Sequence, residues 1–324
     1  MRRCTLFYAL LSIVLALTSA VGCREKQQIT GSTTENTGKP ISISGAYALY
    51  PMVVRWSEEY KARHPGIQFD VQAGGAGKGM TDVLAGAVDI AMISRSIKEV
   101  EVEQGAVPFA VCKDAVVFVV NAQNPVLDLL SAHGLTKEQL ARLFLNPEPI
   151  TWGALLGTGH TERVNVYTRA DSCGAAEMVA KYLGVEAQED LHGIAVNGDP
   201  GVAEAVRRDP LGIGYNNIGF AYDLTTGVAV SGLQVVPLDL NGNYQLDPDE
   251  SFYATKTDIV AAIAAGRYPS PPARALYLVT KGSPDPVEAD FIRWVLTDGQ
   301  AFVDEVGYVS LPETVLQTEL GRLP

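Results

Sequence analysis

The chain is predicted to adopt an α/β fold built on open parallel or mixed sheets. After residue 40, short strand-like runs alternate with helical patterns. Three of these runs break at glycine and continue directly into a helical pattern, at 41–54, 71–86 and 166–183. The first N–H groups of such helices are unpaired and lie at the positive end of the helix dipole, where an anion binds favourably. We therefore expect several helix ends to converge on one negatively charged small molecule.

The segment from residue 67 to residue 93 predicts a strand, a helix and a second strand. Apolar and polar residues alternate over 67–73, as in a half-buried strand. Apolar residues then recur at i, i+3, i+4 and i+7 over 80–87, which places them on one face of a helix. The short apolar run at 88–93 has the length of a buried strand.

The later part of the chain continues this alternation. The run AVVFVV at 115–120 predicts a strand that is buried on both faces. Thr136 and Gln139 have the spacing of a capping box at the start of a helix over 136–144. Two further strands and an amphipathic helix are predicted at 211–215, 275–279 and 290–306.

The first residues have the features of a secretory signal. Arg2 and Arg3 precede an apolar stretch at 6–17, and small residues follow. The AVGC sequence that ends at Cys23 is similar to a bacterial lipobox, so we predict a lipoprotein signal peptide at 1–22 and a lipid on Cys23. An ordinary cleaved signal and a short membrane anchor are the alternatives, but the apolar run is too short to span a bilayer comfortably. The polar segment 23–39 predicts a flexible tether.

Length and charge limit the function of the remaining chain. Residues 40–324 exceed a usual single domain and favour two lobes. No second hydrophobic stretch in the sequence has the length of a membrane span, so membrane contact is expected through the lipid anchor only. The formal net charge of −12 argues against nucleic acid as a partner. An anion site here must therefore be a local arrangement.

The sequence lacks the motifs of several common enzyme classes. It contains no G-x-S-x-G, H-E-x-x-H or C-x-x-C motif. The GGAGKGM segment at 74–80 has glycines and a lysine, but Gly79 stands where a phosphate loop needs Ser or Thr for magnesium. The four histidines are isolated in the sequence. We therefore expect a binding protein that is not an enzyme and requires no cofactor.

Several segments together carry a resemblance to a known family. Their order and spacing match the PstS-like phosphate-binding component of ABC importers, a branch of the periplasmic binding proteins, over most of 40–312. The matching segments are 45–51 (GAYALYP), 74–95 (GGAGKGM to AVDIAMISR), 144–152 (FLNPEPITW), 168–177 (TRADSCGAAE), 212–217 (GIGYNN), 268–279 (YPSPPARALYLV) and 294–312.

The resemblance implies a fold, a ligand and a partner. The fold would be the two-lobed type II fold, in which each lobe is an open mixed sheet flanked by helices. Lobe one would comprise 40–113 and 276–324, and lobe two would comprise 114–275. The lobes would close on phosphate or a similar oxyanion at the periplasmic or extracytoplasmic face, and the protein would deliver it to an ABC permease in the inner membrane.

The same resemblance implies a set of ligand-binding residues. Arg169 would hold the anion with two charge-assisted bonds, and Asp171 would hold its guanidinium in place. Arg95 would be either a second cation at the cleft or a latch between the lobes. A surface salt bridge for Arg169 and a solvated charge for Arg95 are the alternatives. The full set is Ala48, Leu49, Ala76, Gly77, Ser94, Arg95, Arg169, Asp171, Cys173, Gly174 and Ala175.

The chain also departs from the family at these positions. Phosphate-binding relatives carry Ser or Thr on the turns, whereas Ser94 is the one hydroxyl left here. Relatives that discriminate phosphate from sulfate often use a carboxylate to accept the phosphate proton, and Arg95 stands in that region. The sequence therefore leaves open whether the anion is phosphate, sulfate, arsenate or molybdate.

Cys173 offers a different ligand chemistry. A thiol at a helix N-terminus beside Arg169 is expected to have a lowered pKa. Together with Cys112 it would suit a thiophilic ligand such as arsenite or a soft metal. The alternative is a small residue that fills a tight turn. The two cysteines either form a disulfide or, as we rather expect, are free and mostly buried. The second candidate function is accordingly a non-transport sensor or scaffold lipoprotein with a degenerate or thiophilic site.

One further segment has the spacing of a calcium-binding loop. Oxygen-bearing side chains occupy the EF-hand positions of a twelve-residue loop, and the residue at position 7 supplies its carbonyl group. Tyr244 stands where glycine normally makes the sharp turn. We therefore predict either a structural calcium or an acidic Asx-rich turn. The candidate ligands are Asp239, Asn241, Asn243, Gln245, Asp247 and Glu250.

Overall fold

This computed structural model describes residues 39–324. The predicted signal peptide at 1–22, the lipid-bearing Cys23 and all but the last residue of the predicted tether at 23–39 lie outside the described residues. In the described part, no helix combines the length and the apolar character that crossing a membrane requires.

The strands form a mixed main sheet with the order β2-β1-β3-β11-β4-β8-β6-β7, and β9 also pairs with β4. β1 is parallel to β2 and β3, and β6 is parallel to β7 and β8, whereas β4 and β11 run antiparallel to their neighbours. A two-stranded parallel sheet pairs β5 with β10. The strands are β1 (Ile41–Gly45), β2 (Phe69–Ala73), β3 (Ile90–Ile93), β4 (Ala106–Asn121), β5 (Leu135–Thr136), β6 (Asn165–Arg169), β7 (Ile194–Val196), β8 (Gly212–Asn217), β9 (Leu233–Val236), β10 (Leu238–Asp239) and β11 (Ala273–Lys281). The predicted α/β class with mixed sheets is confirmed.

Helices occupy the connections between these strands. They are α1 (Tyr50–Arg63), α2 (Ala76–Leu84), α3 (Glu99–Glu103), α4 (Leu127–His133), α5 (Lys137–Phe144), α6 (Trp152–Leu156), α7 (Gly174–Leu183), α8 (Gly198–Arg208), α9 (Ile218–Ala221), α10 (Lys256–Ala264), α11 (Pro286–Leu296), α12 (Val303–Val306) and α13 (Glu313–Leu320), with 3₁₀ turns at Gln188–Asp190 and Asp298–Phe302. The three glycine breaks predicted from the sequence are the β1–α1, β2–α2 and β6–α7 turns.

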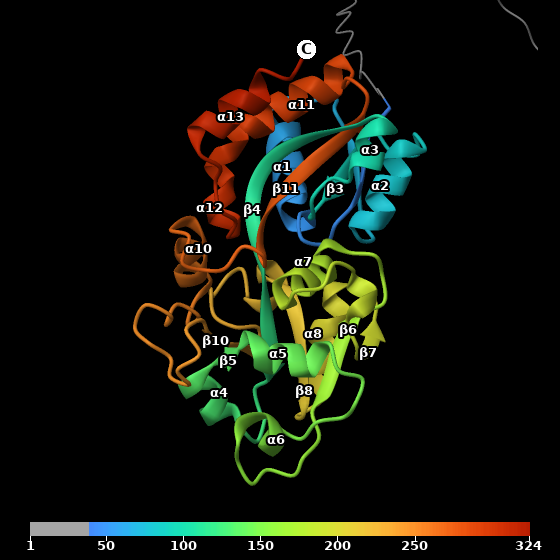
Figure 1. Ribbon diagram of the computed structural model, residues 1–324. Helices are drawn as coiled ribbons and strands as arrows, with labels where there is room; N and C mark the ends of the chain where they lie inside the picture. Colours follow the sequence, from blue (N-terminus) through green and yellow to red (C-terminus); the bar gives the residue numbers. More distant parts are fainter. Residues whose placement is uncertain (1–38) are drawn as a thin grey trace, which may run out of the picture. The chain divides into compact units, whose positions relative to one another are not determined.

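Two hydrophobic cores lie along the main sheet. The first core draws its residues from 41–112 and 276–316, and the second core draws them from 115–273 together with Val309. β4 and β11 pair side by side, as the teal and orange strands in Figure 1 show. Both strands contribute residues to both cores. Along β4 the residues pass from one core to the other at Asp114, and along β11 they do so at Arg274. These two residues are partners in the register of the strands.

The helix predicted at 136–144 begins as the sequence indicates. Thr136 donates its backbone N–H to Gln139 Oε1 at 2.9 Å, and Gln139 donates its own to Thr136 Oγ1 at 3.2 Å. This reciprocal capping box satisfies two N–H groups that the helix leaves unpaired. The predicted cap is confirmed, and α5 follows it directly.

The helical pattern predicted at 290–306 is not one helix. α11 starts earlier because Asp285 caps it through the N–H groups of Val287 and Glu288, with Pro286 at the first helical position. It ends at Leu296, where Thr297 leaves the helical region with φ −118° and ψ −98°. The 3₁₀ turn that follows presents the carbonyl of Gly299 to the Trp56 indole at 2.7 Å. This contact with α1 requires the break.

Candidate anion-binding site

The β2–α2 and β6–α7 turns meet, although their strands belong to different cores. Gly77 at the start of α2 donates its N–H to the Ser172 carbonyl at 3.1 Å. Gly174 at the start of α7 lies so close to Ser94 that an added Cβ would overlap the Ser94 carbonyl oxygen. A Cβ on Gly75 would lie 2.8 Å from an Asp171 carboxylate oxygen. Two predicted helix N-termini therefore lie in direct contact.

The β1–α1 turn reaches the same place through Tyr47. A Cβ on Gly198, at the start of α8, would lie 3.0 Å from the Tyr47 ring. The Arg169 guanidinium lies 5.5 Å from the centre of that ring. Tyr308 donates its hydroxyl to the Ala48 carbonyl at 2.6 Å and so holds the β1–α1 turn in place. The three predicted turns thus converge, and α8 adds a fourth helix N-terminus that was not predicted.

Arg169 is held by two carboxylates. Its Nε and Nη2 donate to Asp171 at 2.8 and 2.5 Å, as the sequence predicted. Its Nη1 donates to Asp199 Oδ2 at 2.6 Å. Three of the five guanidinium N–H groups are used, which leaves one on each terminal nitrogen for a ligand. The Arg169 side chain is 1% exposed, so the surface salt bridge considered as an alternative is not what the structure contains.

The surroundings keep Asp171 and Arg169 ionised. Burial alone would raise the pKa of Asp171, but the hydrogen bonds and charge of Arg169 outweigh burial and hold that pKa below its usual value. Burial opposes the charge of Arg169 as well, and Asp199 with Asp171 raises its pKa further despite that. The guanidinium therefore stays charged in a nearly dry site.

Arg95 lies between the two cores and is buried. Its two terminal nitrogens donate to both carboxylate oxygens of Glu101, at 2.9 and 2.6 Å. Its Nε lies 3.6 Å from Glu177 Oε2 on α7. Of the interpretations considered, this geometry fits a contact between the two halves of the molecule. It does not fit a solvated charge, because the Arg95 side chain is 6% exposed.

The predicted backbone donors fall into two groups. Leu49, Gly77 and Cys173 donate their N–H groups to protein acceptors, namely Ala46 O, Ser172 O and Gln188 Oε1. Within residues 39–324, no acceptor receives the N–H groups of the others. These free donors are those of Ala48, Ala76, Gly174 and Ala175. They are the donors that an anion bound at these turns would find unpaired.

Three buried residues of this region were missed. Asp199 lies at the start of α8, Asn217 at the end of β8 and Arg274 at the start of β11. The GDPG segment at 198–201 carries a helix-start signal that would have pointed to Asp199. A pair of asparagines at the end of an apolar strand would have pointed to Asn217. No local pattern marks Arg274.

The expectation of a reactive Cys173 is wrong. Burial raises the pKa of the Cys173 thiol to about 12, because the desolvation cost exceeds the stabilising charge of Arg169. Its Sγ accepts the Ala176 N–H at 3.4 Å and so caps α7. Cys112 and Cys173 are both free and buried, and they belong to different cores. Cys173 is a small residue in a tight turn.

The loop that carries the predicted calcium ligands closes on itself. Asp239 accepts the N–H groups of Gly242 and Tyr244 at 2.7 and 2.8 Å. Glu250 accepts those of Leu240 and Asn241 at 2.9 and 3.2 Å. No cluster of three or more His, Cys, Asp or Glu side chains suited to a metal ion occurs among residues 39–324. Tyr244 makes the turn at the glycine position with φ 60°.

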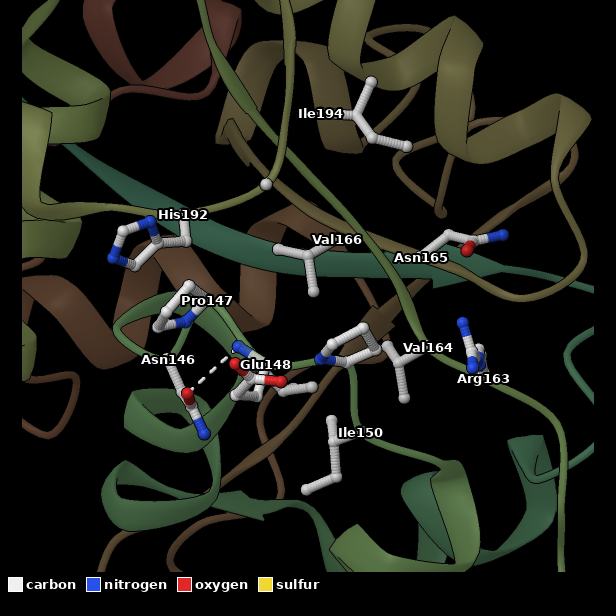
Figure 2. A pocket seen from close by; sticks show the side chains of 13 residues that line it. Asn146, Pro147, Glu148, Ile150, Arg163, Val164, Asn165, Val166, His192 and Ile194 are labelled. Carbon is white, nitrogen blue, oxygen red and sulfur yellow. Dashed lines mark hydrogen bonds between the residues drawn. The ribbon is translucent and has the colours of Figure 1, made fainter.

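A pocket of about 240 Å³ lies elsewhere in the second core, near the start of β6. Figure 2 shows Ile150, Val164 and Val166 around it, and a dashed line joins Asn146 to Glu148. The Asn146 side chain accepts the Glu148 N–H, and the two atoms are 3.0 Å apart. Asn165 is turned away to Asp209, to which it donates at 2.7 Å. The walls are mainly apolar, and Arg169 lies at the other end of β6. This pocket is therefore separate from the converging turns.

The sequence is similar to a family of known proteins. The model of the PBP superfamily domain matches residues 30–299. Among curated proteins, the phosphate-binding protein PstS of Pseudomonas aeruginosa is 27% identical over 311 residues, which cover 87% of this chain and 86% of that protein. The phosphate-binding protein PstS of Bacillus subtilis is 25% identical over 232 residues, which cover 71% and 74%.

Solved structures share the fold. A putative phosphate ABC transporter substrate-binding protein from Clostridium perfringens with bound phosphate superposes with a TM-score of 0.68 at 20% identity, covering 85% of this chain and all of that one. An ABC-type phosphate transport receptor from Vibrio cholerae gives a TM-score of 0.60 at 22% identity, with 84% and 100% covered. The predicted two-lobed α/β fold is confirmed.

Proposed function

Because this chain belongs to the PBP superfamily, we propose that it is a solute-binding protein that captures phosphate or a similar oxyanion for an ABC permease. Its curated relatives are named phosphate-binding proteins, and the solved protein from Clostridium perfringens holds phosphate. The proposal places the protein on the extracytoplasmic side, lipid-anchored through Cys23 after removal of residues 1–22. It includes no enzymatic activity.

One observation carries the proposal. The N-termini of α2 and α7 meet beside the charged Arg169, and the N–H groups of Ala76, Gly174 and Ala175 have no acceptor among residues 39–324. Unpaired amides at helix N-termini bind oxyanions well, and a desolvated guanidinium adds charge-assisted bonds. Because these donors are parts of the protein itself, the site requires no cofactor.

The proposed ligand set follows from this geometry. Arg169 supplies its two remaining N–H groups, and Asp171 with Asp199 orients it. Ala48, Ala76, Gly174 and Ala175 supply free backbone N–H groups, and Ser94 supplies a hydroxyl. The other predicted backbone donors are Leu49, Gly77 and Cys173. Each either shapes its turn through its present hydrogen bond or releases its protein acceptor and donates its N–H to the ligand instead.

Capture would occur by closure of two lobes. We place the lobe boundaries at 113/114 and 275/276, which agrees with the change of core at Asp114 and Arg274. Contacts such as the Gly77–Ser172 hydrogen bond and the Arg95–Glu177 pair would form on closure and exclude water from the anion. Excluding water strengthens every charged interaction in the site.

Titration calorimetry tests the proposal. The protein is titrated with phosphate, sulfate, arsenate, molybdate and arsenite, each with and without calcium, so that the predicted loop ligands are tested as well. Arg169→Lys keeps the positive charge but loses the planar guanidinium with its several N–H donors. We expect it to weaken phosphate binding at least about 100-fold. Arg163→Lys, on the exposed surface of the second core, is the matched control and should bind as the unaltered protein does. Unchanged phosphate affinity in Arg169→Lys would contradict the assignment.

The second candidate is a non-transport sensor or scaffold with a degenerate site. The observation in its favour is that Gly77 donates to Ser172, while alanines stand where hydroxyl groups are expected. It predicts a well-folded protein that binds no oxyanion in the same titrations.

A further inference from the structure

A chain of buried polar groups lies where β4 and β11 pass from one core to the other. It begins at Arg274, which is 7% exposed and stands opposite Asp114 in the β4–β11 register. Both residues are buried, and they stand on strands that consist mainly of apolar residues. A buried cation at such a place is costly unless its contacts serve a purpose.

Arg274 contacts both halves of the candidate site. Its Nε donates to the Ser94 carbonyl at 2.9 Å, and Ser94 follows β3 in the first core. Its Nη2 donates to Asn217 Oδ1, and Asn217 ends β8 in the second core. The planar Arg274 guanidinium thus joins the ends of β3 and β8, which belong to different cores.

The connection continues from Asn217 to Arg169. Asn217 donates from Nδ2 and from its backbone N–H to Asp199 Oδ1, at 2.7 and 2.9 Å. Asp199 Oδ2 accepts Arg169 Nη1 at 2.6 Å. Asn217 and Asp199 are 2% and 1% exposed, so water does not compete for these bonds. Each group in the sequence Ser94, Arg274, Asn217, Asp199 and Arg169 is bonded to the next.

We propose that Arg274 is a positioning residue of the oxyanion site. It aligns Ser94 with Arg169 because it bonds both Ser94, which follows β3, and Asn217 at the end of β8. The inference rests on the proposed function, because it assigns Arg274 a role in that same site. Arg274 does not contact the ligand. It acts through Asn217 and Asp199 on the guanidinium that does.

The fork is essential to this role. A lysine at position 274 keeps the positive charge that compensates Asp114, whose Oδ2 lies 3.6 Å from Arg274 Nη2 and lacks a hydrogen-bond partner among the described residues. A single ammonium group cannot reproduce two diverging N–H donors on a planar frame. Arg274→Lys therefore separates alignment from charge compensation.

The test is a double-mutant cycle in phosphate affinity. Arg274→Lys, Asn217→Ser and the double variant are compared with the unaltered protein by titration with inorganic phosphate, and thermal unfolding is measured in parallel. We expect each single variant to weaken binding about tenfold or more, and the double variant to bind no more weakly than the worse single one. Arg208→Lys, an exposed arginine on α8, is the matched control.

The outcomes separate the two proposals. An unaltered protein that binds no phosphate overturns the proposed function and this inference together. Phosphate binding that is unchanged in Arg274→Lys, or effects of the two substitutions that simply add, overturns this inference alone. Should Arg274→Lys fail to fold, Asn217→Ser still decides the matter, because it interrupts the same connection and keeps both side chains of the Asp114–Arg274 pair.

The pH profile gives a readout that a purely structural role would not change. Burial raises the pKa of Asp114 to about 7, and the groups that face it are Arg274 on β11, Asp199 on α8, Cys112 on its own strand and Tyr308 after α12. Ionised Asp114 competes with Asn217 for Arg274. Relative to Asp114→Asn, phosphate affinity of the unaltered protein should therefore fall several-fold between pH 6 and pH 8. The ionisation of phosphate affects both proteins equally and so cancels in this comparison. Equal pH dependence of phosphate affinity in the unaltered protein and in Asp114→Asn would contradict the inference.

Discussion

Asp114 shows the free-energy cost of burying a charged group where β4 and β11 pass from one core to the other. Its Oδ2 lies close to Arg274 without a hydrogen bond, and the side chain is fully enclosed. Burial raises its pKa from 3.8 to about 7, and the nearby Arg274 only partly opposes the shift. The folded protein therefore holds a proton at Asp114 over a pH range in which the unfolded chain does not.

This difference predicts a pH-dependent stability. Between about pH 4 and pH 7 the folded state binds more protons at Asp114 than the unfolded state, so its contribution to stability falls as pH rises and is constant above pH 7. Asp114→Asn removes this loss, and we expect it to raise the free energy of unfolding at pH 8 by about 1–3 kcal/mol and to change it little at pH 4. Urea unfolding at both pH values measures the effect. The exposed Asp70→Asn is the control, and an equal change at both pH values would contradict the expectation.

Residues close together in the sequence were predicted better than residues joined by the fold. The Arg169–Asp171 pair was predicted because the two are neighbours along one turn. Asp199, Asn217 and Arg274 lie far apart in the sequence and meet only because the sheet places β11, β4, β8 and β6 side by side. For Cys173 the sequence indicated a buried thiol, the helix dipole and the nearby arginine, but not that burial outweighs the two charge effects.

At the scale of elements, the glycine turns serve as contact surfaces as well as helix starts. Gly174 begins α7 and packs on Ser94 at the end of β3, in the other core. The glycine pattern predicted where these helices begin, because a turn into a helix depends on local backbone geometry. It did not predict that the turns press on each other, because that depends on strand order.

The contact predicts a selective effect of one methyl group. The Cβ of Gly174→Ala would overlap the Ser94 carbonyl, and separation of the two cores would relieve that overlap. We therefore expect phosphate affinity to fall at least about tenfold, with a melting temperature within about 3 °C of the unaltered protein. Calorimetry and thermal unfolding measure the two quantities.

Gly201→Ala is the matched control for that substitution. Gly201 lies in α8, and a Cβ there would have its nearest neighbour, the Val196 side chain, at 3.8 Å. An added methyl group in this helix should stabilise it slightly and leave phosphate binding unchanged. Equal binding by Gly174→Ala and Gly201→Ala would show that the close approach of α7 to β3 has no part in capture.

At the scale of the whole molecule, the proposed closure of the two lobes would depend on an ion pair that joins the cores. Arg95 is held by Glu101 within the first core and lies 3.6 Å from Glu177 of the second core. Glu177 also accepts Lys181 Nζ at 2.8 Å, within α7. A ligand that binds the closed form gains apparent affinity from any contact that stabilises closure.

Glu177→Gln should therefore shift the balance toward the open form. Loss of the partly buried charge pair removes about 1 kcal/mol of closure energy, so phosphate affinity is expected to fall roughly fivefold and the ligand-free protein to have a larger radius of gyration. Lys181→Gln removes the neighbouring pair within α7 but not the contact between cores, so it should change neither quantity. Small-angle scattering and calorimetry on the two variants decide the matter. Equal behaviour of Glu177→Gln and Lys181→Gln would exclude Arg95 as a latch, because only the first substitution alters a contact that crosses between the cores.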